Sequence, residues 1–209
     1  MSDRSAVRRS ETFLLGIAGG SGSGKTTLAN AIEARAGRAA ADVIQHDWYY
    51  RDRSQALPGE RASINYDEPA ALDNELLADH LRLLKSGVAV DCPQYDFATR
   101  AREERARRVT PRPVLIVEGI LLFCQAELRG LLDLRVFVDT DADLRLLRRV
   151  RRDISERGRD IAAIEAQYLG SVRPMHLKHV APTRRYADLI VADGSGEDGL
   201  AGIMACLPL

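Results

Sequence analysis

The feature that most constrains this chain is an eight-residue glycine-rich segment near its N-terminus. Residues 19–26 read GGSGSGKT, which matches the pattern G-x-x-x-x-G-K-[ST]. A short apolar run at 13–18 precedes the segment and an amphipathic stretch at 24–37 follows it, so a strand and a helix are expected on its two sides. Glycines let the backbone curl around phosphate oxygens, and the following helix points its positive end at them. The segment therefore predicts a phosphate-binding loop for a nucleoside triphosphate.

The lysine of this loop stands out against the composition of the chain. Among 30 basic residues only Lys25, Lys85 and Lys178 are lysine, so arginine is the usual cation here. A lysine in the loop indicates a position that needs a compact ammonium group, which suits the β- and γ-phosphates. The hydroxyl of Thr26 is suited to bind Mg²⁺. The residues expected to bind the nucleotide are Gly19, Gly20, Ser21, Gly22, Ser23, Gly24, Lys25, Thr26 and Thr27.

Short apolar runs alternate with longer amphipathic stretches along the rest of the chain. Strands are expected at 13–18, 42–46, 114–117, 134–138 and 187–191, and helices at 24–37, 70–86, 125–132, 141–156, 160–179 and 198–207. This alternation predicts an α/β fold of the P-loop NTPase type, with a doubly wound parallel sheet of about five strands and helices on both faces. The stretch 88–112 interrupts the pattern and is interpreted as a small β-hairpin flap. We expect one domain over residues 1–209.

Acidic residues directly follow several of the expected strands. Chemistry in a doubly wound sheet collects beyond the carboxyl ends of the strands. Asp47 is placed there to accept the proton of an acceptor hydroxyl, and Glu118 is placed to hold Mg²⁺ or its water. Asp139 precedes a helix start and is interpreted as a cap. His46, next to Asp47, is given no role.

An arginine-rich helix and the turn after it form the second distinctive segment, a lid expected at about 141–160. Thr140 and Asp143 have the spacing of a capping box at its start. Seven arginines fall within 145–159, and four of them share one helix face, namely Arg145, Arg148, Arg149 and Arg152. A solvated charged face is the alternative, but this density, with Gly158 as a hinge, favours guanidinium groups that clamp phosphoryl oxygens and a lid that excludes water.

The overall charge and the cysteines exclude several classes of protein. The 30 basic and 30 acidic residues cancel, so no net field draws the chain to nucleic acid or to a membrane. No apolar run is long enough for a membrane span or a signal peptide. Three separated cysteines without a C-x-x-C pattern argue against disulfides and zinc. We therefore expect a cytoplasmic protein without nucleic-acid or membrane partners.

A GTPase is also disfavoured by the sequence. Recognition of guanine would need Asn-Lys-x-Asp, and none of the three lysines follows an asparagine. The only D-x-x-G, from Asp193 to Gly196, lies after the last expected strand, away from the γ-phosphate. An ATP-binding regulator without catalysis remains an alternative to an enzyme.

Taken together, the motifs resemble those of the uridine kinase (uridine–cytidine kinase) family of P-loop nucleoside kinases, from about residue 13 to residue 191. The segments that carry the resemblance are GIAGGSGSGKT (16–26), DWYY (47–50), NYDEP (65–69), PQYDF (93–97), EGIL (118–121), FVDTDAD (137–143), RDISERGRD (152–160), QY (167–168), VRP (172–174) and YAD (186–188).

The resemblance implies transfer of the γ-phosphate of ATP, with GTP as an alternative donor, to the 5′-hydroxyl of uridine or cytidine in pyrimidine salvage. It implies catalytic roles for Asp47, Lys25, Arg152 and Arg157, with Mg²⁺ bound by Thr26, Asp47 and Glu118. It implies that the nucleoside is bound by Asp67, Tyr95, Phe97, Arg100, Arg149, Arg159 and Gln167. It also implies a homotetramer.

Two positions depart from the family pattern. Relatives usually have histidine where this chain has Arg100, and a guanidinium can only donate hydrogen bonds. It cannot accept from the cytosine amine, so uridine is predicted to be preferred over cytidine. The alternative is that Arg100, which opens an arginine-rich run, extends into solvent and takes no part in base recognition. Residues 192–194 read Ala-Asp-Gly where relatives often read Pro-Arg-Gly, which alters the adenine side. The alternative enzyme is a related kinase for phosphoribulose, pantothenate or nicotinamide riboside.

Overall fold

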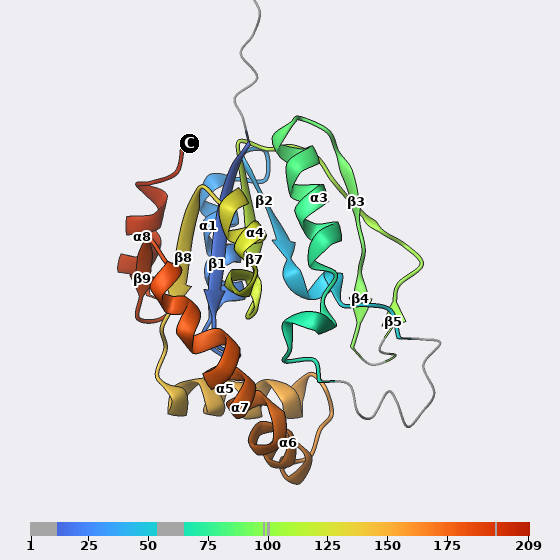
Figure 1. Cartoon of the computed structure of the whole chain (residues 1–209). Coiled ribbons are helices and arrows are strands. Elements are labelled where there is room, and N and C mark those ends of the chain that lie inside the picture. Colours follow the sequence, from blue (N-terminus) through green and yellow to red (C-terminus); the bar gives the residue numbers. More distant parts are fainter. Residues whose placement is uncertain (1–11, 54–64, 98, 100, 195) are drawn as a thin grey trace, which may run out of the picture.

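A five-stranded parallel sheet forms the centre of the chain, with strand order β2-β7-β1-β8-β9. The computed structural model describes residues 12–53, 65–97, 99, 101–194 and 196–209. The strands are β1 (Phe13–Gly19), β2 (Ala41–Gln45), β7 (Val114–Glu118), β8 (Leu134–Val138) and β9 (Leu189–Val191). Figure 1 shows their carboxyl ends pointing toward the arginine-rich helix α5. The sheet confirms the predicted fold class.

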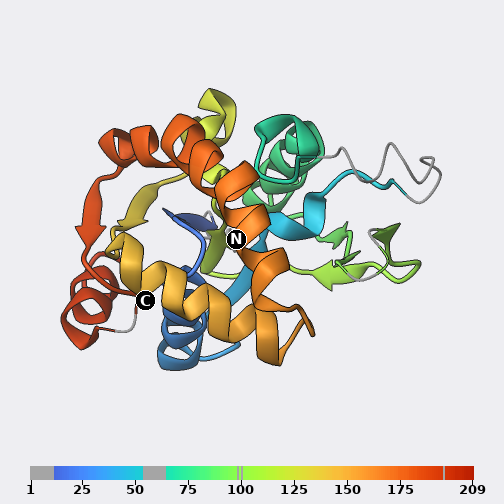
Figure 2. The ribbon, with the colours of Figure 1, turned by 90° about the horizontal axis from the view of Figure 1, so that it is seen from below.

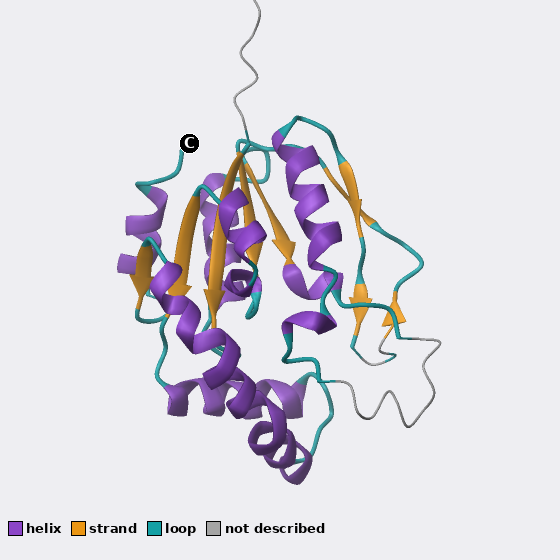
Figure 3. Cartoon of the chain, in the orientation of Figure 1, coloured by secondary structure: helices purple, strands orange, loops and turns teal. Residues whose placement is uncertain are grey.

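Helices cover both faces of this sheet. They are α1 (Lys25–Ala36), α3 (Asn74–Lys85), α4 (Ala126–Leu131), α5 (Ala142–Ser155), α6 (Ile161–Gln167), α7 (Arg173–Met175) and α8 (Glu197–Met204). Figure 3 shows how these helices surround the strands. No helix within the described ranges is long and apolar enough to cross a membrane.

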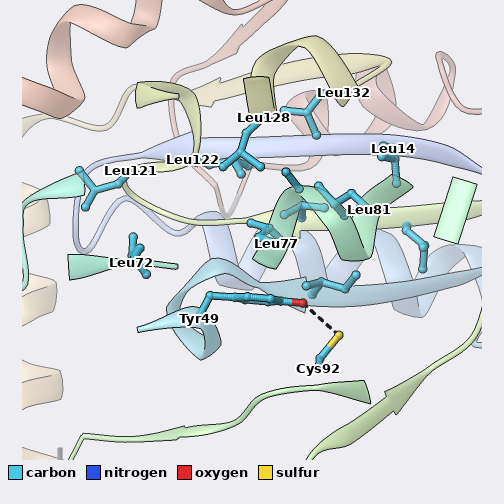
Figure 4. Packing of buried hydrophobic residues seen from close by; sticks show 14 of the residues in the cluster. Leu14, Tyr49, Leu72, Leu77, Leu81, Cys92, Leu121, Leu122, Leu128 and Leu132 are labelled. Atoms are coloured by element: carbon cyan, nitrogen blue, oxygen red, sulfur yellow. Dashed lines mark hydrogen bonds between the residues drawn. The ribbon is translucent and has the colours of Figure 1, made fainter. Parts of the chain in front are cut away.

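Two apolar cores explain why the strands are apolar on both sides. Successive residues of β1 point to opposite faces, so Leu14 joins one buried cluster and Leu15 joins the other. The cluster around Leu14 includes side chains of α3 and α4, and that around Leu15 includes side chains of α1 and α8. Figure 4 shows part of the first cluster, with Leu77 and Leu81 of α3 fully buried in it.

Two expected helices differ from the structure. The stretch expected at 70–86 begins as α3 only at Asn74, because the Asp73 carboxylate accepts the amide hydrogen of Leu76 at 3.4 Å and caps the helix there. The stretch expected at 160–179 is not one regular α-helix. After α6 it widens into π-helical turns at Tyr168–Val172 and His176–Val180, on either side of α7. Pro174 lies between them and has no N–H for the regular ladder.

The expected flap is a hairpin in two sections, both antiparallel. β3 (Val90–Cys92) pairs with β6 (Arg107–Val109), and β4 (Tyr95–Asp96) pairs with β5 (Ala101–Arg102). The Arg107 guanidinium lies over the Trp48 ring at 4.9 Å and forms an ion pair with Asp42. Arg102 donates to the carbonyl of Tyr50 at 3.1 Å. These arginines attach the flap to β2 and to the segment after it.

The start of α5 corrects the expected capping box. Asp141 occupies the N-cap without a side-chain hydrogen bond. The Thr140 hydroxyl instead donates to the carbonyl of Ser23 at 2.9 Å, and Asp143 accepts from the neighbouring amide of Leu144. The threonine therefore ties α5 to the phosphate loop. Figure 2 shows α5 and the segment from α6 onward crossing beneath the sheet.

Candidate active site

The phosphate loop lies between β1 and α1, as its sequence predicts. The amide of Ser23 donates to the carbonyl of Gly20 at 3.1 Å, which closes a tight turn. Gly22 and Gly24 adopt positive φ angles of 79° and 91°, a region that side chains with a Cβ strongly disfavour. Helix α1 begins at Lys25, so its first backbone amides face the loop.

Two segments that are distant in the sequence pack closely against this loop. A Cβ at Gly22 would lie 2.4 Å from the carbonyl oxygen of Arg145 in α5. On the other side, Gly194 follows β9 and packs against Gly24, and a Cβ at Gly194 would lie 2.3 Å from the Gly24 carbonyl oxygen. The amide of Gly194 also donates to the carbonyl of Ser23 at 3.3 Å. The loop is held between the first turn of α5 and the end of the sheet.

The contact with Gly194 leads to a prediction for nucleotide binding. We expect Gly194→Ala to raise the KM for ATP about tenfold, because the added methyl group must displace the backbone of Gly24, and overpacking of this kind costs about 1–3 kcal/mol. Gly196→Ala is the matched control, since a Cβ there would meet its nearest neighbour at 3.6 Å. Steady-state kinetics on both variants provide the measurement. Equal KM values for the two variants would contradict the prediction.

The acidic residues at the strand ends lie beside the loop. Glu118 ends β7 and accepts a hydrogen bond from the Thr26 hydroxyl at 2.9 Å. Burial raises the pKa of the Glu118 carboxyl, Lys25 opposes this shift, and Asp47 adds to it. Asp47 lies in the 3₁₀ turn His46–Tyr49 that follows β2. The sequence therefore correctly predicts that Lys25, Thr26, Asp47 and Glu118 meet at one edge of the sheet.

This group fits a magnesium ion. Mg²⁺ prefers hard oxygen ligands, keeps several waters, and is often held by one or two carboxylates together with substrate phosphates. The Thr26 hydroxyl and the Glu118 carboxylate already touch each other, and the buried carboxylate favours a nearby cation. In the described part of the chain no three His, Cys, Asp or Glu side chains form a cage for a metal on their own. The donors present match a metal that is completed by phosphate and water.

Two further strand-end residues have structural contacts. Asp139 does not cap α5; its carboxylate accepts from the Nε of Arg184 at 2.7 Å on the surface. His46 is fully buried, and its Nε2 lies 2.9 Å from the Oδ1 of Asn74 at the start of α3. A Cβ at Gly119 would lie 2.5 Å from the Cβ of His46, so this histidine packs beneath the turn after Glu118.

A pocket lined in part by Ser21, Asp67 and Arg149 lies next to the loop. Arg149 donates to the Ser21 hydroxyl and to the Gln167 amide oxygen, at 3.0 Å in both cases. Arg159 donates to the same Gln167 oxygen at 2.5 Å. Asp67 accepts from the Ser171 hydroxyl at 2.9 Å. Burial raises the pKa of the Asp67 carboxyl, and Ser171 and Arg149 partly offset this shift.

Of the residues predicted to bind the acceptor, Asp67, Arg159 and Gln167 come together around Arg149, which is itself almost fully buried. Ser171 is a contact that the sequence analysis missed. Its hydroxyl reaches Asp67 from the first π-helical turn, a geometry that no local pattern indicates.

Aromatic rings of the flap cluster with rings from the segments after β2. The rings of Tyr95 and Phe97 lie with their centroids 5.3 Å apart. Tyr50 and Tyr66 complete the cluster and were missed, with centroids 5.3 Å and 6.4 Å from Tyr95. The Tyr50 hydroxyl donates to the Tyr66 carbonyl at 2.8 Å. Arg100 lies outside the residues that the structure describes.

The arginines of the predicted lid divide into two groups. Arg145 donates to the carbonyl of Thr140 at 3.0 Å, and Arg148 forms two hydrogen bonds of 2.9 Å with Asp193 after β9. Asp193 thus pairs with α5 at the position where the sequence departs from its relatives. The second group is Arg149, Arg152, Arg157 and Arg159, which surround the buried carboxylate of Asp153. No pattern in the sequence indicates a role for Asp153.

Comparisons with known proteins show which family the chain resembles. A family model described as "Phosphoribulokinase / Uridine kinase family" matches residues 14–198. A curated protein of Chloroflexus aggregans named uridine kinase is 53% identical over 182 residues, which is 87% of either chain. A uridine kinase of Brevibacillus brevis is 48% identical over 181 residues, covering 87% of this chain and 85% of the relative. The solved phosphoribulokinase of Rhodobacter spheroides superposes with a TM-score of 0.64 at 18% identity, over 90% of this chain and 74% of that one.

Proposed function

The chain belongs to the phosphoribulokinase / uridine kinase family, and from that premise we propose that it transfers the γ-phosphoryl group of ATP to the 5′-hydroxyl of a pyrimidine ribonucleoside, with uridine as the main acceptor. Membership in a family of kinases replaces the alternative of a regulator without catalysis. The curated relatives named uridine kinase support uridine as the acceptor.

The hydrogen bonds of Arg149 are the observation that carries this proposal. One guanidinium bonds to Ser21 of the phosphate loop and to Gln167 of the acceptor pocket, so the two binding sites share a side chain. Phosphoryl transfer requires donor and acceptor oxygens in line, at contact distance. A pocket that borders the loop in this way supports direct transfer between two bound substrates.

The acceptor pocket has the chemistry of a nucleoside site. A buried carboxylate such as Asp67 can accept hydrogen bonds from two ribose hydroxyls. The rings of Tyr95 and Phe97 offer flat apolar faces to a base. A sugar phosphate would instead need a second anion site and would gain nothing from the aromatic cluster.

Asp47 is proposed to be the general base. Its carboxylate accepts the proton of the 5′-hydroxyl while that oxygen forms its bond to the γ-phosphorus. The bond from the γ-phosphorus to the bridging oxygen breaks, and ADP leaves with the electron pair. Lys25 and the lid arginines hold the phosphoryl oxygens as negative charge shifts among them. Mg²⁺, held by Thr26, Glu118 and Asp47, would neutralise charge on the β- and γ-phosphates.

A panel of acceptors tests the proposed function. We expect ATP-dependent monophosphate formation with uridine, weaker turnover with 2′-deoxyuridine, and none with adenosine or with ribulose 5-phosphate. The 2′-deoxynucleoside lacks one partner of Asp67, and loss of a hydrogen bond to a buried charged group costs about 1.5–3 kcal/mol, roughly 10- to 150-fold. Cytidine in the same panel measures base preference. Turnover of ribulose 5-phosphate without turnover of any nucleoside would overturn the proposal.

A further inference from the structure

One carboxylate in the lid has no part in the chemistry described so far. Asp153 lies near the end of α5 and is completely buried. Its Oδ1 accepts from the Nε and Nη2 of Arg152 at 3.0 and 2.9 Å and lies 3.4 Å from the Nη1 of Arg157. Its Oδ2 lies 3.6 Å from both Arg149 and Arg159 and has no hydrogen-bond partner among the residues that the structure describes. Four guanidinium groups therefore converge on a single buried anion.

These arginines extend from Asp153 to three other parts of the molecule. Arg149 reaches Ser21 of the phosphate loop, and both Arg149 and Arg159 reach Gln167 of α6. The Arg157 guanidinium lies over the ring of Phe97 in the flap, 5.3 Å from its centroid. The carboxylate thus stands where the phosphate loop, the acceptor pocket and the flap meet.

The four arginines differ in how closely they approach the Asp153 carboxylate. Arg152 is bound most tightly, because it donates two N–H groups to one oxygen at hydrogen-bond distance. Arg149, Arg157 and Arg159 stand at 3.4–3.6 Å, which is attraction without a short hydrogen bond. A guanidinium has five N–H donors, so these three keep donors for another anion. Four positive charges against one negative charge leave the cluster strongly attractive to a polyanion.

We propose that Asp153 is a positioning residue that gathers Arg149, Arg157 and Arg159 around the place where the transferred phosphoryl group must lie. The proposal rests on the proposed phosphoryl transfer. Without this carboxylate the four guanidinium groups would repel one another, and those that are partly exposed would turn toward solvent. An ordinary helix-surface ion pair does not explain the arrangement, because Asp153 is completely buried and Arg159 lies beyond the end of α5.

The proposal predicts a particular division between kcat and KM in Asp153→Asn, which keeps the shape and removes the charge. We expect kcat with uridine to fall about 10- to 100-fold, because displacement of a catalytic group by about 1 Å costs on the order of 100-fold. We expect the KM for ATP to stay the same or fall, because loss of a negative charge makes the site more attractive to the triphosphate. A lid that is merely damaged would lose kcat and ATP affinity together.

Asp160→Asn provides the matched control. Asp160 caps α6 by accepting from the amide of Ala163 at 2.7 Å, is exposed, and makes no ion pair with the arginine cluster in the described structure. Asparagine is an equally good N-cap, so the variant removes the same charge from the same segment without loss of structure. Its kcat is expected to stay within about twofold of the unaltered enzyme. Thermal melting of both variants verifies that they are folded.

The outcomes distinguish this proposal from the proposed function. If the unaltered enzyme does not phosphorylate uridine, the proposed function fails; if it does and Asp153→Asn has the same kcat, the positioning role fails. A fall in kcat with an equal rise in the KM for ATP would also overturn it. If Asp153→Asn does not fold, Asp153→Asn/Arg152→Gln removes a charge of each sign. We expect its kcat to be at least about fivefold below that of Arg152→Gln, and equal kcat values would overturn the proposal.

Discussion

Asp47→Asn is expected to bind ATP as the unaltered enzyme does and to lose about 10²–10⁴-fold in kcat, the usual contribution of a positioned general base. Asparagine keeps the size of the side chain but cannot take the proton of the acceptor hydroxyl. The residue lies in a short 3₁₀ turn rather than in the sheet, so the substitution leaves the core intact. Turnover under saturating ATP and uridine measures the loss, and nucleotide titration measures the binding.

Measuring the activity of Asp47→Asn at several Mg²⁺ concentrations distinguishes a role of Asp47 as general base from a role as metal ligand. If the carboxylate mainly holds the metal, a higher Mg²⁺ concentration will restore much of the activity. If it is the base, activity stays low at every Mg²⁺ concentration. Asp91→Asn, an exposed flap position that pairs with Arg108, is the matched control and is expected to leave kcat unchanged. Near-normal turnover by Asp47→Asn would remove it from the chemical step.

Lys25→Ala is expected to weaken ATP binding and turnover together, with kcat/KM lower by about 10²–10³-fold, as when one preorganised donor to a developing charge is removed. Lys25 also lowers the pKa of the Glu118 carboxyl, so its loss makes the neighbouring carboxylate harder to ionise. Alanine is a good residue in the first turn of α1, so the fold is retained. Lys178→Ala, at an exposed position, is the control. A variant that keeps ATP affinity and loses only kcat would contradict the shared role.

The features that could be predicted are those encoded in local patterns of the sequence. The phosphate loop is encoded in contiguous residues, and the carboxyl ends of buried parallel strands converge by topology, so Lys25, Thr26, Asp47 and Glu118 were correctly expected to meet. The sheet followed from apolar runs that the two cores require. These inferences need no knowledge of how distant segments pack.

Contacts between distant segments account for what was missed. In the sequence Asp153 resembles any other charged residue of an arginine-rich helix, and only the structure shows that it is completely buried beside four arginines. Ser171 reaches Asp67 through a widened helical turn, and Tyr50 joins the flap aromatics across the end of β2. Asp193 meets Arg148 because the end of the sheet folds back on α5. No spacing rule connects such positions.

The contact between Gly24 and Gly194 has a consequence for biosynthesis. Strand β1 pairs with β7 and β8, so Phe13 can pair only after Val114 has been synthesised, and Leu15 only after Leu134. The contacts of the phosphate loop are complete only once Gly194 has been synthesised. A nascent chain on the ribosome therefore carries its glycine loop for most of translation without a nucleotide site. Because ATP stabilises only the folded state, it can assist folding only after the last strand has been made.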